Sequence, residues 1–407
     1  MPTLENAWYR RILFLLVYMV ESIITLVTLS YFPMLFTDLG LDPRVYGVVG
    51  SLSLIPMVVK FFVGPLSDRF PIPFIRGKKR GYFLLGALIN IIFLPFLALN
   101  PVNFLILFGI VWFLQTLGIA VMDIMSDTFA IEARSIQNLK GRTGASLWMF
   151  AGVFVGGALA IAFVPVLEAN LLFGLLLFAG LSVPPLVMGL LLKGKSVEDE
   201  TKVHIREVVR ENLKRPFVKM GLLFFFLLNI DAGLLELTLE PYLYTTFGID
   251  KQTVVGTVFL ISFLGVILAG LGYFFIDKVQ KSRLLMIISA IYIVPSVLLF
   301  YFILTGTITK ELFITLYAIF AAVSGLSYVT YTGLFFDLSD PKAAGTMIAL
   351  YFSVTNLGMV IGIAVGGFLA MSTIYLIVAI ICALRILPLS RIKMRDVEKT
   401  FYQQKED

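Results

Sequence analysis

The sequence predicts an all-α integral membrane protein with about twelve transmembrane helices in two pseudo-symmetric six-helix bundles. Three observations carry this prediction: the composition, a series of long apolar runs and an internal repeat. Of the 407 residues, 59% are hydrophobic and only 14% are charged, whereas soluble domains have about 45–50% apolar and about 25% charged residues. A soluble surface cannot be built from so few polar residues, so much of the surface must contact lipid.

The apolar runs set the number of helices. A helix that spans a bilayer needs about 20 mostly apolar residues, and the breaks between the runs contain turn-forming Gly, Pro, Asn and Asp. The predicted spans are 12–36, 45–66, 82–99, 104–130, 144–166, 171–192, 217–243, 253–276, 284–304, 312–336, 345–370 and 374–389.

The distribution of Lys and Arg predicts the orientation, because cytoplasmic loops carry the excess of positive charge. Of 32 such residues, only Arg44, Lys251 and Lys310 fall in the loops of one side and Lys60 falls inside a predicted helix. The other 28 lie at the termini and in the loops of the opposite side. We therefore expect a multi-pass protein of the cell membrane with both termini in the cytoplasm.

The longest polar stretch divides the chain into 1–192, a linker at 193–216 and 217–407. In the linker, Ser196 and Asp199 have the spacing of a capping box, and apolar residues follow at helical intervals. This pattern predicts a short amphipathic helix on the cytoplasmic face. A disordered linker is the alternative.

The two halves repeat one another. Residues of the first half recur 208 to 210 positions later: Pro33, Gly40, Asp42, Asp127 and Val155-Gly156-Gly157 become Pro241, Gly248, Asp250, Asp337 and Val365-Gly366-Gly367. Such a near-constant offset indicates duplication, as in many transporter folds. Gly152 and Gly156, and likewise Gly358 and Gly362, have the spacing of close helix–helix contacts.

A charged loop follows the second predicted span. It reads Gly64-Pro-Leu-Ser-Asp68-Arg69 and continues to Arg76-Gly-Lys78-Lys79-Arg80. Glycine allows close helix approach, Asp68 can cap a neighbouring helix, and the basic residues can hold the loop to anionic lipid. The basic residues alone would also fit an ordinary cytoplasmic loop.

The whole pattern resembles the signature loop of the major facilitator superfamily, and Asp277-Lys278 with Lys281 and Arg283 is a degraded counterpart in the second half. Three stretches, 56–82, 122–146 and 343–358, resemble the branch that contains folate–biopterin transporters, muropeptide permeases and acetyl-CoA transporters. The resemblance implies the major facilitator fold, in which helices 1, 4, 7 and 10 line a central cavity. The chain departs from the branch at Asp337-Leu338-Ser339, where we expect a Cys-Pro-like turn.

At least five carboxylates lie inside predicted spans, where an ionised group is costly unless it is paired or functional. Glu21 lies about ten residues beyond Arg11, hence about 15 Å deep, and Asp123 and Asp127 are four residues apart on one helix face. Asp231 and Glu236 belong to the seventh span. Unpaired buried carboxylates favour the protonated form, so we expect Glu21, Asp123, Asp231 and Glu236 to take part in proton coupling; structural pairing is the alternative.

Two cations, Lys60 and Arg385, lie at least four residues inside a predicted span. Lys60 is a candidate partner for Asp123 or for an anionic solute. Six polar or aromatic residues are candidates for recognising a ring-bearing solute, although each can instead serve helix packing: Trp112, Gln115, Asn229, Tyr328, Tyr331 and Asn356.

The remaining charged candidates are expected to gate the cytoplasmic side. Asp127 can pair with Arg134 or Arg142 near that surface, and Asp337 and Asp277 hold the corresponding places in the second half. With one cysteine and one histidine, the sequence predicts no internal disulfide and no metal site. We expect no cofactor.

These features predict a secondary active transporter, not an enzyme, that moves a small organic solute by alternating access, with proton-coupled symport favoured. Its expected partners are the solute, protons and the lipid bilayer, with no nucleic acid and a monomeric state. A passive facilitator and a proton-coupled exporter of cationic or lipophilic compounds are the alternatives; a membrane-embedded enzyme or a receptor is less favoured. The branch suggests a carboxylated solute, whereas an acid-lined cavity suggests a neutral or cationic one.

Overall fold

The computed structural model describes residues 6–70, 72–73, 75, 77–132, 139–193, 205–236, 239–273, 279–340 and 344–401. Throughout these residues the regular secondary structure is helical and contains no strand. The chain forms two compact units, Met1–Lys202 (unit 1) and Val203–Asp407 (unit 2).

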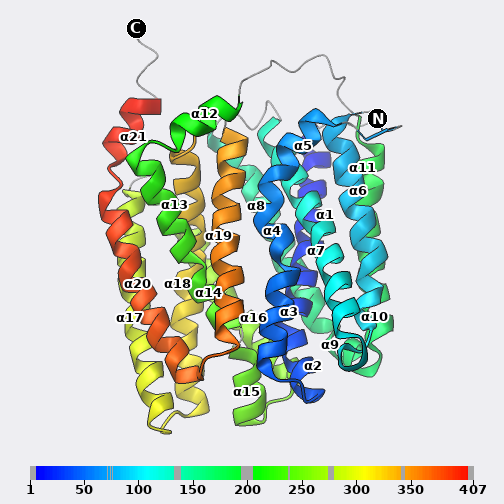
Figure 1. Cartoon of the computed structure of the whole chain (residues 1–407), viewed down its shortest axis with the longest axis vertical. Helices are drawn as coiled ribbons and strands as arrows, with labels where there is room; N and C mark the ends of the chain where they lie inside the picture. The colour runs from blue at the N-terminus through cyan, green and yellow to red at the C-terminus, as the bar shows by residue number, and fades with distance from the viewer. Residues whose placement is uncertain are drawn as a thin grey trace. The chain divides into compact units, whose positions relative to one another are not determined.

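Unit 1 is a bundle of long helices, several of them built from shorter consecutive segments (Figure 1). The segments are α1 Ala7–Thr25, the π-helix η1 Leu26–Tyr31, α2 Phe32–Asp38, α3 Pro43–Ser53, α4 Ile55–Val59, the 3₁₀-helix η2 Lys60–Phe62, α5 Val63–Arg69, α6 Lys78–Phe93, the 3₁₀-helix η3 Leu94–Ala98, α7 Pro101–Glu132, α8 Leu139–Ala162, α9 Val164–Ala169, α10 Leu171–Leu181 and α11 Val183–Leu191.

Unit 2 repeats this plan, with a short helix before its first span and another after its last. The segments are α12 Ile205–Asn212, α13 Pro216–Leu228, α14 Ile230–Glu236, α15 Leu239–Phe247, α16 Lys251–Tyr273, α17 Lys281–Leu304, α18 Lys310–Asp337, α19 Ala344–Gly366, α20 Met371–Arg391 and α21 Met394–Phe401. Figure 1 shows α12 and α21 at the same end of unit 2.

The predicted fold class is confirmed. In the described part of the chain, eleven helical stretches are long and apolar enough to cross a membrane, and Ala151–Ala162 within α8 is a shorter apolar helix. Helix pairing within each unit follows one scheme. In unit 1, α1 packs along α8 and α6 along α7; in unit 2, α13 and α14 pack along α19, and α17 along α18.

The glycines with close-contact spacing lie at helix crossings, as predicted. A side chain at Gly152 or Gly156 would collide with the backbone carbonyls of Leu15 or Met19 on α1. Gly358 and Gly362 on α19 stand in the same relation to the backbone of α13 and α14. Bare backbone at these positions lets the paired helices approach closely, which is how apolar helices associate in lipid.

The repeated Gly and Asp of the two halves have a structural reason. Gly40 and Gly248 have φ of 69° and 64°, a left-handed conformation that glycine adopts without strain at helix ends. Asp42 and Asp250 then cap the following helices, accepting hydrogen bonds from the backbone N–H groups of Arg44 at 2.8 Å and Thr253 at 2.9 Å. Each repeat therefore ends one helix and starts the next.

Several spans that the sequence presents as continuous helices are interrupted. Among them, the first contains the π-helix η1, the second changes to a 3₁₀-helix at Lys60, and the seventh breaks at Asn229. Proline at the start of α4 removes a backbone donor and favours the break between α3 and α4. The interruptions place Lys60 and Asp231 next to irregular backbone.

Candidate functional site

Unit 1 contains a group of charges that we call the N-terminal charge cluster: the buried Lys60 on η2 and Asp123 on α7, and the half-buried Glu21 on α1 and Asp127 on α7. Each of the three carboxylates interacts electrostatically with the Lys60 ammonium. The four residues come from the first, second and fourth spans. The cluster therefore joins three helices of one bundle through charge.

The strongest contact in the cluster is an ion pair. Lys60 Nζ donates to Asp123 Oδ2 at 2.5 Å, and each side chain is only 6% exposed. The pairing that the sequence offered as one alternative for Lys60 is therefore present. Because a buried charge is very costly without a partner, each residue depends on the other.

Asp127 has a neutral partner. The Tyr18 hydroxyl donates to Asp127 Oδ1 at 2.6 Å, and Tyr18 precedes Glu21 by one helical turn on α1. The expected pairing of Asp127 with Arg134 or Arg142 stays a prediction, because Arg134 and the side chain of Arg142 are outside the described part of the chain. Sequence reasoning missed Tyr18. Its i, i+3 spacing from Glu21, which places both side chains on one face of α1, is the signal that could have identified it.

Glu21 differs from the other two acids. Its Oε2 is buried and accepts no hydrogen bond from any described residue, although Asp123, Asp127 and Lys60 all interact with it electrostatically. A buried carboxylate oxygen without a donor is costly when the group is ionised. Of the three acids of the cluster, only Glu21 has such an oxygen among the described residues.

Unit 2 holds a second buried pair. Arg385 Nη2 on α20 donates to Asp231 Oδ2 on α14, and these side chains are 2% and 8% exposed. The same nitrogen contacts the Cys382 sulfur at 2.9 Å, and the guanidinium lies 5.9 Å from the centre of the Tyr292 ring. Sequence reasoning named Asp231 but missed Arg385 as its partner, although Arg385 was one of only two cations at least four residues inside a predicted span.

Glu21 and Asp231 lie in the first and the seventh span, which the internal repeat relates, and are 210 positions apart. Each half therefore carries an acid in its first span. In unit 2, Asp231 pairs with Arg385 through Oδ2, while its Oδ1, like Oε2 of Glu21, is buried and accepts no hydrogen bond from a described residue.

Two further unit 1 candidates are packed inside the bundle. Gln115 is fully buried and donates to Asn90 Oδ1 at 2.9 Å, and Asn90 donates to the Ser182 hydroxyl at 3.2 Å. Trp112 is fully buried among aromatic rings, with Tyr46 at 5.8 Å. Both contacts tie helices of the bundle together.

The unit 2 candidates have mixed surroundings. Asn229 lies at the break between α13 and α14 and is half-buried, as is Asn356 on α19. Tyr328 and Tyr331 on α18 pack edge to face at 5.3 Å, with Tyr328 42% exposed. The side chain of Glu236 lies outside the described residues.

The signature loop is described in part. Arg80 donates from Nε to the carbonyl of Gly189 at 2.9 Å and from Nη2 to that of Leu190 at 2.6 Å, which satisfies carbonyls at the end of α11. A side chain at Gly64 would meet no atom of the described residues within 4 Å, so the close helix approach expected there stays a prediction. Lys79 is half-buried.

The other loop candidates lie beyond this description. Nothing is described of Arg76, Arg134 and Asp277, or of the side chains of Asp68, Arg69, Lys78 and Arg142. In unit 2, Lys281 at the start of α17 pairs with Asp337 at the end of α18, with Nζ to Oδ2 at 2.8 Å. These side chains are 17% and 27% exposed.

The fold and the buried charges define a multi-pass helical membrane protein with ionisable groups inside its bundles. The sequence matches the Major Facilitator Superfamily over residues 12–363. The chain belongs to this superfamily, which makes it a transporter and not an enzyme. No curated protein matches the chain significantly.

Solved structures share the fold. A D-xylose-proton symporter aligns with a TM-score of 0.74 at 12% identity, over 95% of this chain and 97% of that one. The nucleoside transporter NupG aligns with 0.70 at 16% identity, over 96% and 99%. The inward-open xylose transporter XylE from E. coli aligns with 0.70 at 11% identity, over 97% and 98%. At these identities the likeness concerns the fold alone.

Proposed function

We propose that the protein is a proton-coupled secondary active transporter that carries a small organic solute across the cell membrane by alternating access, with both termini in the cytoplasm. Symport is the favoured mode. One observation carries the proposal: Glu21 has a buried carboxylate oxygen without a hydrogen bond, next to the Lys60–Asp123 ion pair. The proton-coupled symporter among the solved structures is consistent with this mode.

The charge balance of the cluster explains why it would take up protons. With every group ionised, three carboxylates face one ammonium, and that ammonium already pairs with Asp123. A proton on Glu21 reduces the excess of negative charge at the position that lacks a donor. A ligand that binds two conformations unequally shifts the balance between them, so a proton that binds Glu21 more tightly in one conformation drives the change of access.

Lys60 links the proton to the other acids. When Glu21 is neutral, Lys60 is held by Asp123 and Asp127 alone; when Glu21 is ionised, it competes for the same ammonium. The proton on Glu21 thereby sets the strength of the bond between the second and the fourth span. This coupling within unit 1 is the mechanism that the proposal requires.

The solute class is the finer part of the proposal. The resemblance of 56–82, 122–146 and 343–358 to the folate–biopterin, muropeptide and acetyl-CoA branch favours a carboxylated solute, whose negative charge the incoming protons offset. The solved relatives named for sugar and nucleoside transport make neutral solutes the second candidate. A screen of pterins, peptidoglycan fragments, sugars, nucleosides and cationic compounds separates these classes.

The test is uptake by proteoliposomes with and without an imposed proton gradient. Wild type is compared with Glu21→Gln and with the matched control Glu168→Gln, which makes the same change at an exposed position of unit 1. The proposal expects gradient-driven accumulation in wild type and control, and only equilibration in Glu21→Gln. Equal, gradient-insensitive equilibration in all three proteins would leave a passive facilitator.

A further inference from the structure

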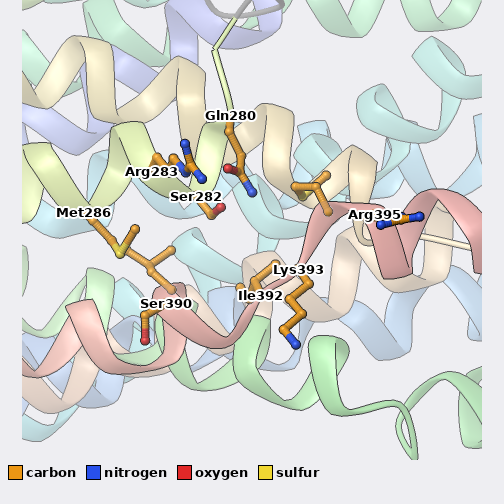
Figure 2. Close-up of a pocket in the computed structure, with 10 residues that line it drawn as sticks. Gln280, Ser282, Arg283, Met286, Ser390, Ile392, Lys393 and Arg395 are labelled. Carbon is orange, nitrogen blue, oxygen red and sulfur yellow. The ribbon is translucent and has the colours of Figure 1, made fainter.

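A pocket of about 320 Å³ opens at one end of unit 2, where α17 begins and α20 gives way to α21 (Figure 2). Figure 2 shows Gln280, Ser282 and Arg283 from the start of α17 on one side, and Lys393 and Arg395 from the α20–α21 junction on the other. The membrane-spanning stretches Lys281–Leu304 and Met371–Arg391 end here. The pocket therefore lies at the membrane surface, on the side that the positive charges assign to the cytoplasm.

The pocket has a strong excess of positive charge. Arg283, Lys393 and Arg395 line it, and the residues that line it include no Asp or Glu; Asp396 follows Arg395 in the chain but does not line the pocket. None of the three cations makes an ion pair with a described residue. Their neighbour Lys281, by contrast, is neutralised by Asp337.

The start of α17 adds hydrogen-bond donors for which the described side chains provide no acceptor. Ser282 is 2% exposed and lines the pocket, yet its hydroxyl makes no hydrogen bond to any described group. The Gln280 side chain does not cap the helix, so the first backbone N–H groups have no side-chain acceptor. A helix start favours negative charge, but Arg283 in this first turn is positive. An anion in the pocket would satisfy the hydroxyl and the helix and would offset the arginine.

The rest of the pocket is apolar. Met286, Leu389 and Ile392 line it, and Leu389 and Ile392 are 1% and 2% exposed. Beyond the pocket, α17 and α20 present exposed apolar side chains along the spans, including Ile287 at 57% and Leu387 at 60%. A polar group held by the cations could thus continue into acyl chains that lie along the two helices.

We propose that this pocket binds a phosphate group, and the neighbouring apolar surface favours the head group of an anionic membrane lipid as its source. Arginine side chains form charge-assisted, often bidentate hydrogen bonds with phosphate. Basic pockets between membrane helices on the cytoplasmic side are suited to such head groups. The proposal is independent of the transported solute and of the proton mechanism.

The test uses the full chain, purified in non-ionic detergent and stripped of lipid. Binding is measured by native mass spectrometry and by ligand-induced shifts of the unfolding temperature. Three probes are used: a phosphatidylglycerol, the diacylglycerol with the same acyl chains, and inorganic phosphate. The pocket variant is Arg283→Gln/Arg395→Gln. The matched control, Lys219→Gln/Arg391→Gln, removes the same charge from exposed positions that do not line the pocket.

We expect phosphatidylglycerol to bind wild type and control alike, and the pocket variant to bind at least about tenfold more weakly, because two charge-assisted contacts are lost. Diacylglycerol should bind none of them. Inorganic phosphate could instead raise the unfolding temperature in a way that depends on Arg283 and Arg395, with no binding of lipid. The pocket would then still be a phosphate site, and its ligand would be a soluble phosphate compound.

Two results would overturn the proposal: equal phosphatidylglycerol binding by the pocket variant and the control, or equal binding of diacylglycerol and phosphatidylglycerol. Ser282→Ala guards against a folding defect in the double variant. It removes only one hydroxyl and should weaken phosphatidylglycerol binding severalfold, with the unfolding temperature of the lipid-free protein unchanged.

Discussion

Removing the Lys60 ammonium should destabilise unit 1 more than removing the Asp123 carboxylate, although the two form one ion pair. Lys60→Met leaves the buried Asp123 and the half-buried Glu21 and Asp127 without the cation that faces all three. Asp123→Asn leaves Lys60 within range of two remaining acids. The environment of the pair is therefore asymmetric.

The magnitudes follow from the geometry. At 2.5 Å, the gross attraction is about 7 kcal/mol with an effective dielectric constant of about 20, and the cost of burying both charges offsets much of it. Lys60→Met should cost about 3–5 kcal/mol, the usual result of leaving a buried charge unpaired. Asp123→Asn should cost about 1–3 kcal/mol, because Lys60 keeps partners. Lys60→Met/Asp123→Leu should be less destabilising than Lys60→Met alone.

The assay is denaturant unfolding in mixed micelles, followed by tryptophan fluorescence. All three tryptophans, Trp8, Trp112 and Trp148, lie in unit 1, so the signal reports on the bundle that contains the cluster. Lys193→Met is the control, since it removes an exposed lysine of the same unit and should change the free energy of unfolding by less than about 0.5 kcal/mol.

The reasoning about the cluster would be refuted if Asp123→Asn destabilised as much as Lys60→Met. It would also be refuted if the double variant were as unstable as Lys60→Met alone. Either result would mean that Glu21 and Asp127 have no significant electrostatic interaction with Lys60.

Two further predictions concern the scaffold. Arg385→Met should lower the free energy of unfolding by about 3–5 kcal/mol, because it leaves the buried Asp231 carboxylate without its arginine partner. Adding Asp231→Leu should recover part of this loss. An unchanged unfolding temperature in Arg385→Met would contradict the pairing. Gly156→Leu should prevent close packing of α1 and α8 and abolish monodisperse expression. Gly180→Ala, at a helix position with nothing within 4 Å, should be neutral or stabilise by up to about 1 kcal/mol; size-exclusion profiles in which Gly156→Leu matches wild type would rule out the packing argument.

The helical membrane architecture was predictable because it depends on properties that a single sequence contains. Apolar runs long enough to span the bilayer indicate the transmembrane helices, and the offset of about 210 residues indicates the duplication. Gly40 and Gly248 could be recognised for the same reason, because a left-handed helix end followed by an Asp cap is a local pattern. The division into 1–192, 193–216 and 217–407 stays a prediction, although the structure has an α-helix at Ile205–Asn212.

The breaks in the spans and the partners of the buried charges were harder to predict, because they depend on contacts between distant segments. Asp231 and Arg385 are 154 residues apart, and nothing local indicates that α14 and α20 face each other there. Gln115 shows the opposite problem, since a polar residue in an apolar helix has the same sequence signature whether it binds a solute or, as here, Asn90. The positions of the cations were still informative: Lys60 and Arg385, the two that lie at least four residues inside a predicted span, form the ion pairs with Asp123 and Asp231.

Coupling of solute movement to protons through Glu21 can be measured directly as proton flux. Proteoliposomes that contain a pH-sensitive dye are loaded with the solute that the uptake screen identifies and are then diluted, so that solute runs downhill without an imposed pH gradient. We expect proton movement with the solute in wild type and in Glu168→Gln, and solute exchange without proton movement in Glu21→Gln. Undiminished proton movement in Glu21→Gln would exclude Glu21 as the coupling residue.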